Sequence, residues 1–412
     1  MKKFITFLIA IAMATTFLAG QANPEKHGFS KDRLMRLNQE MHEYVDNGEL
    51  SGVQTAIMRH GEIIHFDTYG YADVNSKKEL EEGSIWRIYS MTKPIVSVGL
   101  MMLYEQGEFQ LNDPLSKYIP AMEEMMVHVG DGVTKPAENK IRVVDVLRHT
   151  TGFGYGWGPN TYVDSLYRTV NRRTLKDNKA FVEKLAKLPL YYEPGQGWRY
   201  SVSTDVAGYL IEVISGMPLD KYLEEKILKP LGMNDTHFEV PEDKKDRFLT
   251  NYTTNKEGGL QVIDHPSMSR YTKTVTMFSG GGGMVSTTND YLRFCQMLLN
   301  GGEYEGHRYL SPKTIELMTK DHTKGISHAG GPIALPNDGN GFGLGFSMVT
   351  DLAPTGITGS EGSYGWGGAA GTVFRIDPKE DLIFVMMIQL MPYNHLQARE
   401  KFQTMVYQAL VD

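Results

Sequence analysis

Cysteine is nearly absent from this sequence. The single thiol, Cys295, lies in an apolar run over residues 291–299, so no internal disulfide can form. We expect it to be a buried core residue rather than a nucleophile. The fold must therefore be stabilised by burial, and a chain of 412 residues is long enough to form two lobes that share a core.

Positive charge is also scarce. The chain has 42 Lys and Arg residues against 49 Asp and Glu residues, which gives a formal net charge of −7, and it contains no basic block beyond its first residues. Nucleic acids and anionic membrane surfaces are therefore poor partners. This balance excludes the classes of protein that act through electrostatic attraction to polyanions.

The signatures of several enzyme classes are missing. Because the chain has no Gly-x-Ser-x-Gly elbow, an α/β-hydrolase triad has no obvious nucleophile. The twelve histidines show no His-Glu-x-x-His or other close ligand spacing, which argues against a zinc hydrolase. Glycines 280–283 lack the Lys-Ser/Thr of a phosphate loop and are expected to form a tight turn. No metal or cofactor is predicted.

The first 22 residues hold the only long apolar run. A basic start, an apolar stretch and then small residues are typical of a secretory signal peptide over 1–22, with cleavage after Gly20 or Ala22. The apolar part is short for a membrane span, and Gln21 stands where a lipoprotein signal would need cysteine. We therefore expect an exported protein, periplasmic or secreted, without a stable membrane anchor.

Hydrophobic periodicity predicts sheet-forming segments at both ends of the chain. The expected strands cover 53–58, 63–69, 341–349, 371–376 and 382–388, and the expected flanking helices cover 31–44 and 396–410. These segments imply one α/β lobe over about 27–105 and 275–412. The predicted fold class is α+β, with an antiparallel sheet flanked by helices from both chain ends.

The pattern of predicted elements changes in the middle of the chain, where short helices are separated by Pro and Gly. The expected helices here include 141–149, 179–188 and 203–214. Strand-like runs are scarce, so this part is predicted to be a mostly helical lobe, over about 106–274, inserted into a single domain that spans 23–412.

One stretch, Ser90-Met-Thr-Lys93, carries a pattern with chemical meaning. Residues three apart share a helix face, so the Lys93 amine can reach the Ser90 hydroxyl, and a helix N-terminus favours developing negative charge. It is the only Ser-x-x-Lys in the chain. Taken alone, the spacing is more typical of a capped helix than of an active site.

Further motifs appear in the order found in a known group. The chain, from about residue 27 to 410, resembles the penicillin-binding-protein-like serine hydrolases, which include class C β-lactamases, D,D-peptidases and family VIII carboxylesterases. The resemblance rests on six pieces, namely Ser90 to Lys93 and residues 147–152, 193–201, 228–233, 281–287 and 365–368. It implies a serine β-lactamase-like fold.

The resemblance also implies catalytic roles. Ser90 takes the position of the nucleophile, and Tyr200 takes the acid/base position of the family's Tyr-x-Asn pattern. A serine hydroxyl needs a neighbour that accepts its proton, and either Tyr200 or Lys93 can serve. We favour Tyr200 held by Lys93. The oxyanion hole would be formed by the backbone N–H groups of Ser90 and Ala369.

Two departures from the family pattern bear on the substrate. Trp366-Gly367-Gly368 replaces the usual Lys-Thr-Gly, so no lysine is there to attract a substrate carboxylate, and Val202 replaces the Asn of Tyr-x-Asn. Both changes cost affinity for lactams and peptidoglycan stems and little for a simple ester. The Trp-Gly-Gly sequence also matches family VIII carboxylesterases.

The substrate is expected to lie against this strand. Gly367 and Gly368 leave space for it, while Tyr89, Tyr155, Trp157 and Trp366 are predicted to line an acyl or alcohol pocket. We therefore expect a carboxylesterase that cleaves short-chain acyl esters through an acyl-enzyme on Ser90. The alternatives are activity on a β-lactam or a D-amino-acid peptide with the same fold, and a non-catalytic binding protein.

Overall fold

The computed structural model describes residues 21–158, 161–170, 174–331, 333–337 and 339–412. All but the last two residues of the expected signal peptide lie outside this set. Within the described ranges, no helix has the length and apolar character needed to cross a membrane.

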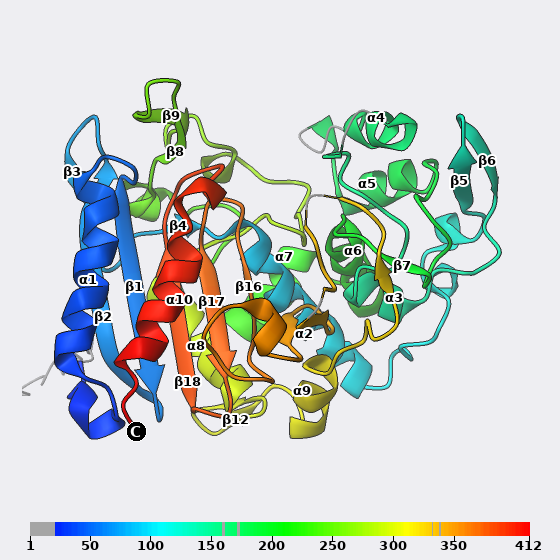
Figure 1. Ribbon diagram of the computed structural model, residues 1–412. Helices are drawn as coiled ribbons and strands as arrows, with labels where there is room; N and C mark the ends of the chain where they lie inside the picture. Colours follow the sequence, from blue (N-terminus) through cyan, green and yellow to red (C-terminus); the bar gives the residue numbers. More distant parts are fainter. Residues whose placement is uncertain (1–20, 159–160, 171–173, 332, 338) are drawn as a thin grey trace, which may run out of the picture.

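A single large antiparallel sheet contains strands from both ends of the chain (Figure 1). Over the described residues it has eight strands in the order β14-β15-β16-β17-β18-β1-β2-β3. Their bounds are β1 Gly52–Arg59, β2 Glu62–Asp73, β3 Lys78–Glu79, β14 Asn340–Phe342, β15 Ser347–Val349, β16 Tyr364–Gly367, β17 Val373–Asp377 and β18 Leu382–Met387. The predicted fold class is therefore confirmed.

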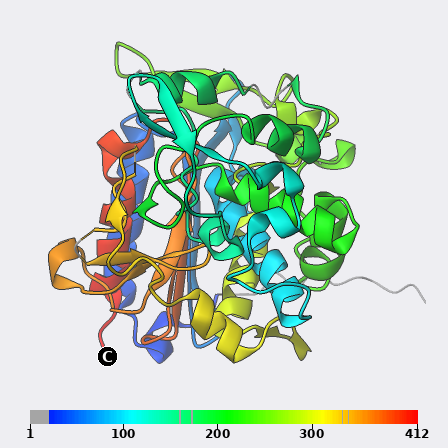
Figure 2. The ribbon, with the colours of Figure 1, turned by 90° about the vertical axis from the view of Figure 1, so that its right-hand side faces the viewer.

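Helices cover both faces of this sheet. The first helix, α1 (Lys31–Asp46), and the last, α10 (Ala398–Ala409), lie side by side on one face, and α8 (Thr288–Leu299) packs on the other (Figure 2). The buried stripe of α1 consists of the residues whose spacing predicts the helix, Leu34, Leu37, Met41 and Tyr44.

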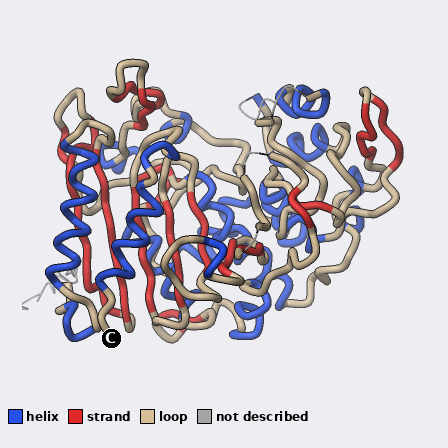
Figure 3. The backbone as a smooth tube through the Cα atoms, viewed as in Figure 1, coloured by secondary structure: helices blue, strands red, loops and turns tan. Residues whose placement is uncertain are grey.

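The inserted lobe contains the helices α3 (Val143–Leu147), α4 (Tyr162–Arg168), α5 (Asn178–Leu185), α6 (Ser203–Ser215) and α7 (Leu219–Leu223). The chain between β4 and β10 also forms two hairpins: β5 (Met126–Gly130) with β6 (Val133–Pro136) lies in the helical lobe, and β8 (Asn251–Thr254) with β9 (Leu260–Asp264) lies at the sheet (Figure 3). The second hairpin packs toward the sheet, because Tyr252 belongs to the core beneath α1 and α10. The remaining short elements are β4 Trp86–Arg87, β7 Gly197–Trp198, β10 Val285–Ser286, β11 Glu303–Tyr304, β12 His307–Arg308, β13 Ser327–His328 and α9 Pro312–Met318.

Two predicted elements are wrong in extent. The expected single strand over 341–349 is a hairpin of β14 and β15, because the chain reverses at Gly345, whose φ of 99° lies in the left-handed region. The expected helix over 141–149 is reduced to α3, which stops before His149, a residue with φ of 61°.

The helix α2 (Thr92–Glu105) lies between the two lobes, where it packs against α6. It is buried along almost its whole length, and Pro94 is accommodated because it lies in the first turn. Its N-terminus, just after Ser90, is therefore fixed by packing from both lobes.

The contact of α10 with the sheet should dominate the stability of the α/β lobe. Phe402 is fully buried and meets Phe384 of β18 edge-on, with ring centroids 5.7 Å apart. Replacing it in Phe402→Ala leaves a cavity and should lower the free energy of unfolding by about 3–5 kcal/mol. Urea denaturation followed by circular dichroism measures this loss.

The control is Met35→Ala on α1, where the side chain is 62% exposed. This change should alter the free energy of unfolding by less than about 0.5 kcal/mol. Equal effects of the two substitutions would contradict the assigned role of the α10 contact.

Candidate active site

Ser90 lies in a single 3-10 turn, Tyr89–Met91, directly before α2. The preceding residue, Tyr89, has φ of 42°, an uncommon conformation for a residue with a side chain. The structure must hold such a backbone in place, and strained residues of this kind cluster at functional sites. The turn presents the Ser90 hydroxyl to a cavity between the lobes.

Lys93 lies one turn further along and is almost completely buried. Its Nζ donates to Ser90 Oγ at 3.3 Å, to the Tyr155 hydroxyl at 2.9 Å and to the Gly281 carbonyl at 2.5 Å. The serine and lysine that the sequence singles out are thus in contact, as their spacing on a helix requires.

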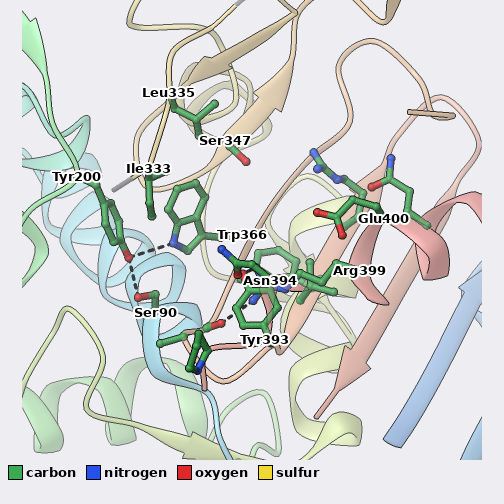
Figure 4. Close-up of a pocket in the computed structure, with 18 of the residues that line it drawn as sticks. Ser90, Tyr200, Ile333, Leu335, Ser347, Trp366, Tyr393, Asn394, Arg399 and Glu400 are labelled. Atoms are coloured by element: carbon green, nitrogen blue, oxygen red, sulfur yellow. Dashed lines mark hydrogen bonds between the residues drawn. The ribbon is translucent and has the colours of Figure 1, made fainter. Parts of the chain in front are cut away.

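Tyr200 completes this cluster from the other lobe. It stands before α6, and its hydroxyl lies 2.6 Å from Ser90 Oγ, while Trp366 Nε1 donates to the same hydroxyl at 3.4 Å (Figure 4). The Lys93 ammonium lies 4.5 Å from the centre of the Tyr200 ring. Burial raises the pKa of Tyr200, although its hydrogen bonds with Ser90 and Trp366 act in the opposite direction.

A buried carboxylate lies close to the cluster. Asp205, in the first turn of α6, accepts hydrogen bonds from Ser279 Oγ at 2.5 Å and from the Gly281 N–H at 3.1 Å. Lys93 and Asp205 therefore bind the carbonyl and the N–H of Gly281. Asp205 is absent from the sequence-based site, because an Asp in the first turn of a helix is ordinarily a solvent-facing cap.

Of the four aromatic residues predicted for the pocket, Trp157 and Trp366 line the cavity, whereas Tyr89 and Tyr155 do not. The rings of Tyr155 and Trp157 stack at 4.1 Å with an interplanar angle of 7°. Trp157 lines the cavity and is 56% exposed, whereas Tyr155 lies behind it and accepts the hydrogen bond from Lys93. No feature of the Gly-Tyr-Gly-Trp segment predicts this polar contact, because Lys93 and Tyr155 are far apart in the sequence.

The two predicted oxyanion donors line the same cavity as the Ser90 hydroxyl. Among the residues that the structure describes, neither the Ser90 N–H nor the Ala369 N–H has a hydrogen-bond acceptor. A Cβ on Gly368 would lie 2.5 Å from the Ile88 carbonyl oxygen, so the strand end approaches the Ser90 turn closely. Two such free amides can bind an oxyanion.

The cavity has a volume of about 640 Å³ and extends from Ser90 past the end of β16 to α10 (Figure 4). Trp157, Ile333, Leu335 and Ile357 make part of its wall apolar. The predicted binding residues Trp366, Gly367 and Gly368 line it as well, whereas Arg399, Glu400 and Gln403 form its far end. It is large enough to hold a small organic substrate.

The described ranges contain no group of three or more His, Cys, Asp and Glu side chains placed to hold a metal ion. His149 is the histidine nearest the cluster, with its ring 5.0 Å from that of Tyr200. It is buried, its Nδ1 lies 3.3 Å from Ser201 Oγ, and burial lowers its pKa well below the usual value. His149 is therefore a neutral residue that packs behind Tyr200.

Comparison with known proteins identifies the family. The family model described as Beta-lactamase matches residues 37–407. The chain belongs to the β-lactamase family. It is a serine hydrolase with the β-lactamase and penicillin-binding-protein fold.

Relatives with different names align over most of the chain. Protein Rv1367c of Mycobacterium tuberculosis is 34% identical, over 85% of this chain and 88% of the relative. Esterase EstB of Burkholderia gladioli is 28% identical, over 80% and 83%. A Salmonella typhimurium protein, provisionally named a D-alanyl-D-alanine carboxypeptidase, is 29% identical, over 89% and 84%.

A solved structure shows the same fold. EstCE1, described as a hydrolase with promiscuous acyltransferase activity, superimposes with a TM-score of 0.77 at 24% identity, over 92% of this chain and 99% of that one. At 24% identity this similarity shows that the two proteins share a fold, and it does not show that they share an activity.

The Tyr200 hydroxyl should be needed for proton transfer. Tyr200→Phe keeps the ring but removes the group next to Ser90, and we expect kcat for ester hydrolysis to fall about 10²–10⁴-fold. Because burial raises the pKa of Tyr200, the phenolate that accepts a proton becomes more populated as pH rises, so kcat/KM of the native enzyme should increase through the alkaline range.

Stopped-flow or plate assays between neutral and alkaline pH measure both effects. The residual activity of Tyr200→Phe should lose this increase with pH. If the increase survives in the variant, the Lys93 amine is the base instead.

Proposed function

We propose that this protein is a carboxylesterase that cleaves short-chain acyl esters through an acyl-enzyme on Ser90. The observation that carries the proposal is the contact of Ser90 Oγ with both Tyr200 and Lys93, beside two free backbone amides and under Trp366. This set supplies a nucleophile, a proton acceptor and an oxyanion site within one cavity.

The proposed reaction begins with attack of Ser90 Oγ on the ester carbonyl carbon. Tyr200 takes the serine proton, and the Lys93 ammonium beside its ring favours the phenolate that does so. The N–H groups of Ser90 and Ala369 bind the oxyanion of the tetrahedral intermediate. The alcohol leaves with the proton from Tyr200, and water then attacks the acyl-enzyme by the same steps to release the acid.

The surroundings of the cluster favour a neutral ester. Trp366 is only 9% exposed and donates its N–H to Tyr200, so it offers no charge to a substrate carboxylate. Val202 is buried and apolar, so it cannot bind an amide side chain as Asn can. The apolar wall at Trp157 and Leu335 suits an acyl chain or an alcohol. The relationship to esterase EstB supports the same substrate class.

Lactams and D-alanyl peptides are the second candidate substrates. They are supported by the family itself and by the relative provisionally named a D-alanyl-D-alanine carboxypeptidase. The nucleophile and oxyanion donors would be the same, so only the recognition groups separate the two candidates. A non-catalytic binding role is a third possibility, but it gives no reason for the assembled cluster.

A panel of substrates tests the proposal. The native protein should hydrolyse p-nitrophenyl acetate and butyrate, with kcat/KM at least about 100-fold above that for a chromogenic cephalosporin, because the uncharged Trp366 stands where a lysine would attract the substrate carboxylate. Ser90→Ala should abolish ester turnover, which is measured as release of p-nitrophenol.

The matched control is Ser347→Ala, since Ser347 also lines the cavity but bonds to a strand carbonyl. It should retain ester hydrolysis. Undiminished turnover by Ser90→Ala would remove the nucleophile assignment, and comparable turnover of the cephalosporin would favour the second candidate. Absence of fluorophosphonate labelling at Ser90 would favour the binding protein.

We further propose that the protein is exported to the periplasm or secreted, on the basis of its first 22 residues. The mature chain recovered from an expressing bacterium should begin at Gln21 or Asn23. N-terminal sequencing after cell fractionation measures this, and an intact Met1 in the cytoplasmic fraction would refute it.

A further inference from the structure

Arg399 has an unusual environment for a cation. It lies in the first turn of α10, where the helix dipole disfavours positive charge, and burial lowers its pKa. Its hydrogen-bond partners among the described residues are backbone carbonyls and a tyrosine hydroxyl rather than a carboxylate. A half-buried guanidinium whose donors go to backbone carbonyls and a hydroxyl, and not to a carboxylate, needs another explanation.

The carbonyls that Arg399 binds all belong to the turn between β16 and β17. Its Nε donates to the Gly371 carbonyl at 3.1 Å, and its Nη2 donates to the carbonyls of Gly368 and Thr372, both at 2.5 Å. Its Nη1 donates to the Tyr393 hydroxyl, and the guanidinium lies 4.0 Å from the centre of that ring. A planar fork with five donors suits this task, which lysine cannot reproduce.

One of these bonds acts on the oxyanion hole directly. The Gly368 carbonyl and the Ala369 N–H belong to the same peptide unit, which is planar, and in a trans peptide they point in opposite directions. Arg399 binds the carbonyl side, as does the Gly371 N–H at 3.1 Å, so the Ala369 N–H points away from the guanidinium, and Ala369 lines the cavity that contains Ser90. A hydrogen bond to the carbonyl also polarises the N–H and strengthens it as a donor.

The glycines of this segment fit between Arg399 and the nucleophile turn. A Cβ on Gly367 would lie 2.6 Å from Arg399 Nη2, and a Cβ on Gly368 would lie 2.5 Å from the Ile88 carbonyl oxygen. The peptide is thus held by the guanidinium on one side and by the Ser90 turn on the other. Side chains at either glycine would push it out of place.

We propose that Arg399 is a positioning residue of the oxyanion hole, which orients and polarises the Ala369 N–H through the Gly368 carbonyl. This inference rests on the proposed function, because it takes Ala369 as an oxyanion donor. Arg399 acts on the transition state through this peptide and need not touch the substrate.

The test compares an aryl ester with its thionoester, in which sulfur replaces the carbonyl oxygen. Sulfur accepts hydrogen bonds poorly, so an ordered oxyanion hole favours the oxygen ester. In Arg399→Met we expect kcat for the oxygen ester to fall roughly 10–100-fold, with KM changed by less than about 3-fold. The preference, which is the ratio of kcat for the oxygen ester to kcat for the thionoester, should fall by a similar factor.

The matched control is Arg59→Met on β1. Arg59 is 6% exposed and, like Arg399, donates to backbone carbonyls. Its partners are the carbonyls of Glu380 at 3.1 Å and His27 at 2.8 Å. This variant should lose stability but keep the preference for the oxygen ester. An unchanged preference in Arg399→Met, or an equal loss in both variants, would overturn the proposal.

If Arg399→Met does not fold, Arg399→Lys allows the same measurement. Lysine keeps the charge but lacks the planar fork, so the preference for the oxygen ester should fall in part. An unchanged preference in Arg399→Lys would equally overturn the proposal.

If the native protein cleaves neither ester, the proposed function fails but the inference is still tested. The rate of fluorophosphonate labelling at Ser90, whose phosphoryl oxygen occupies the same hole, should then fall at least about 10-fold in the Arg399 variants and stay unchanged in Arg59→Met.

Discussion

The buried ammonium of Lys93 is the interaction on which the rest of the site depends. Removing a cation from water costs several kcal/mol unless its donors find acceptors. Here Ser90, Tyr155 and the Gly281 carbonyl accept, and Asp205 holds the opposite side of the Gly281 residue. These groups come from the turn before α2, the helical lobe and the returning chain, so a single charge requires all three to meet.

The sequence predicts the parts of this arrangement that are local or carried by ordered motifs. Ser90 and Lys93 meet because they are three residues apart at a helix start, and the β1–β2 hairpin follows from two strand-like runs, 53–58 and 63–69, separated by a short turn. The hairpin at 340–349 is missed because a glycine with a left-handed backbone reverses an otherwise strand-like run. Local pattern alone does not report where the chain changes direction.

The contacts missed by sequence reasoning share one physical cause. Tyr155, Asp205 and Arg399 bind groups that are distant in the chain or belong to the backbone, such as the Lys93 ammonium, the Gly281 N–H and the Gly368 carbonyl. A hydrogen bond to a backbone group cannot be inferred from residue types. The sequence also does not distinguish an Asp or Arg removed from solvent from one that is exposed. Only the assembled fold shows which charges are desolvated and therefore demand partners.

The stacked pair of Tyr155 and Trp157 has a consequence for anyone who alters the substrate range. Widening the cavity by shortening Trp157 would remove the surface against which the Tyr155 ring lies, and the Tyr155 hydroxyl is an acceptor for the Lys93 ammonium. A change made to the proposed acyl-binding wall would thus reach the charge beside Ser90, the proposed nucleophile. Substitutions chosen to alter specificity at Trp157 would therefore also alter the surroundings of Lys93.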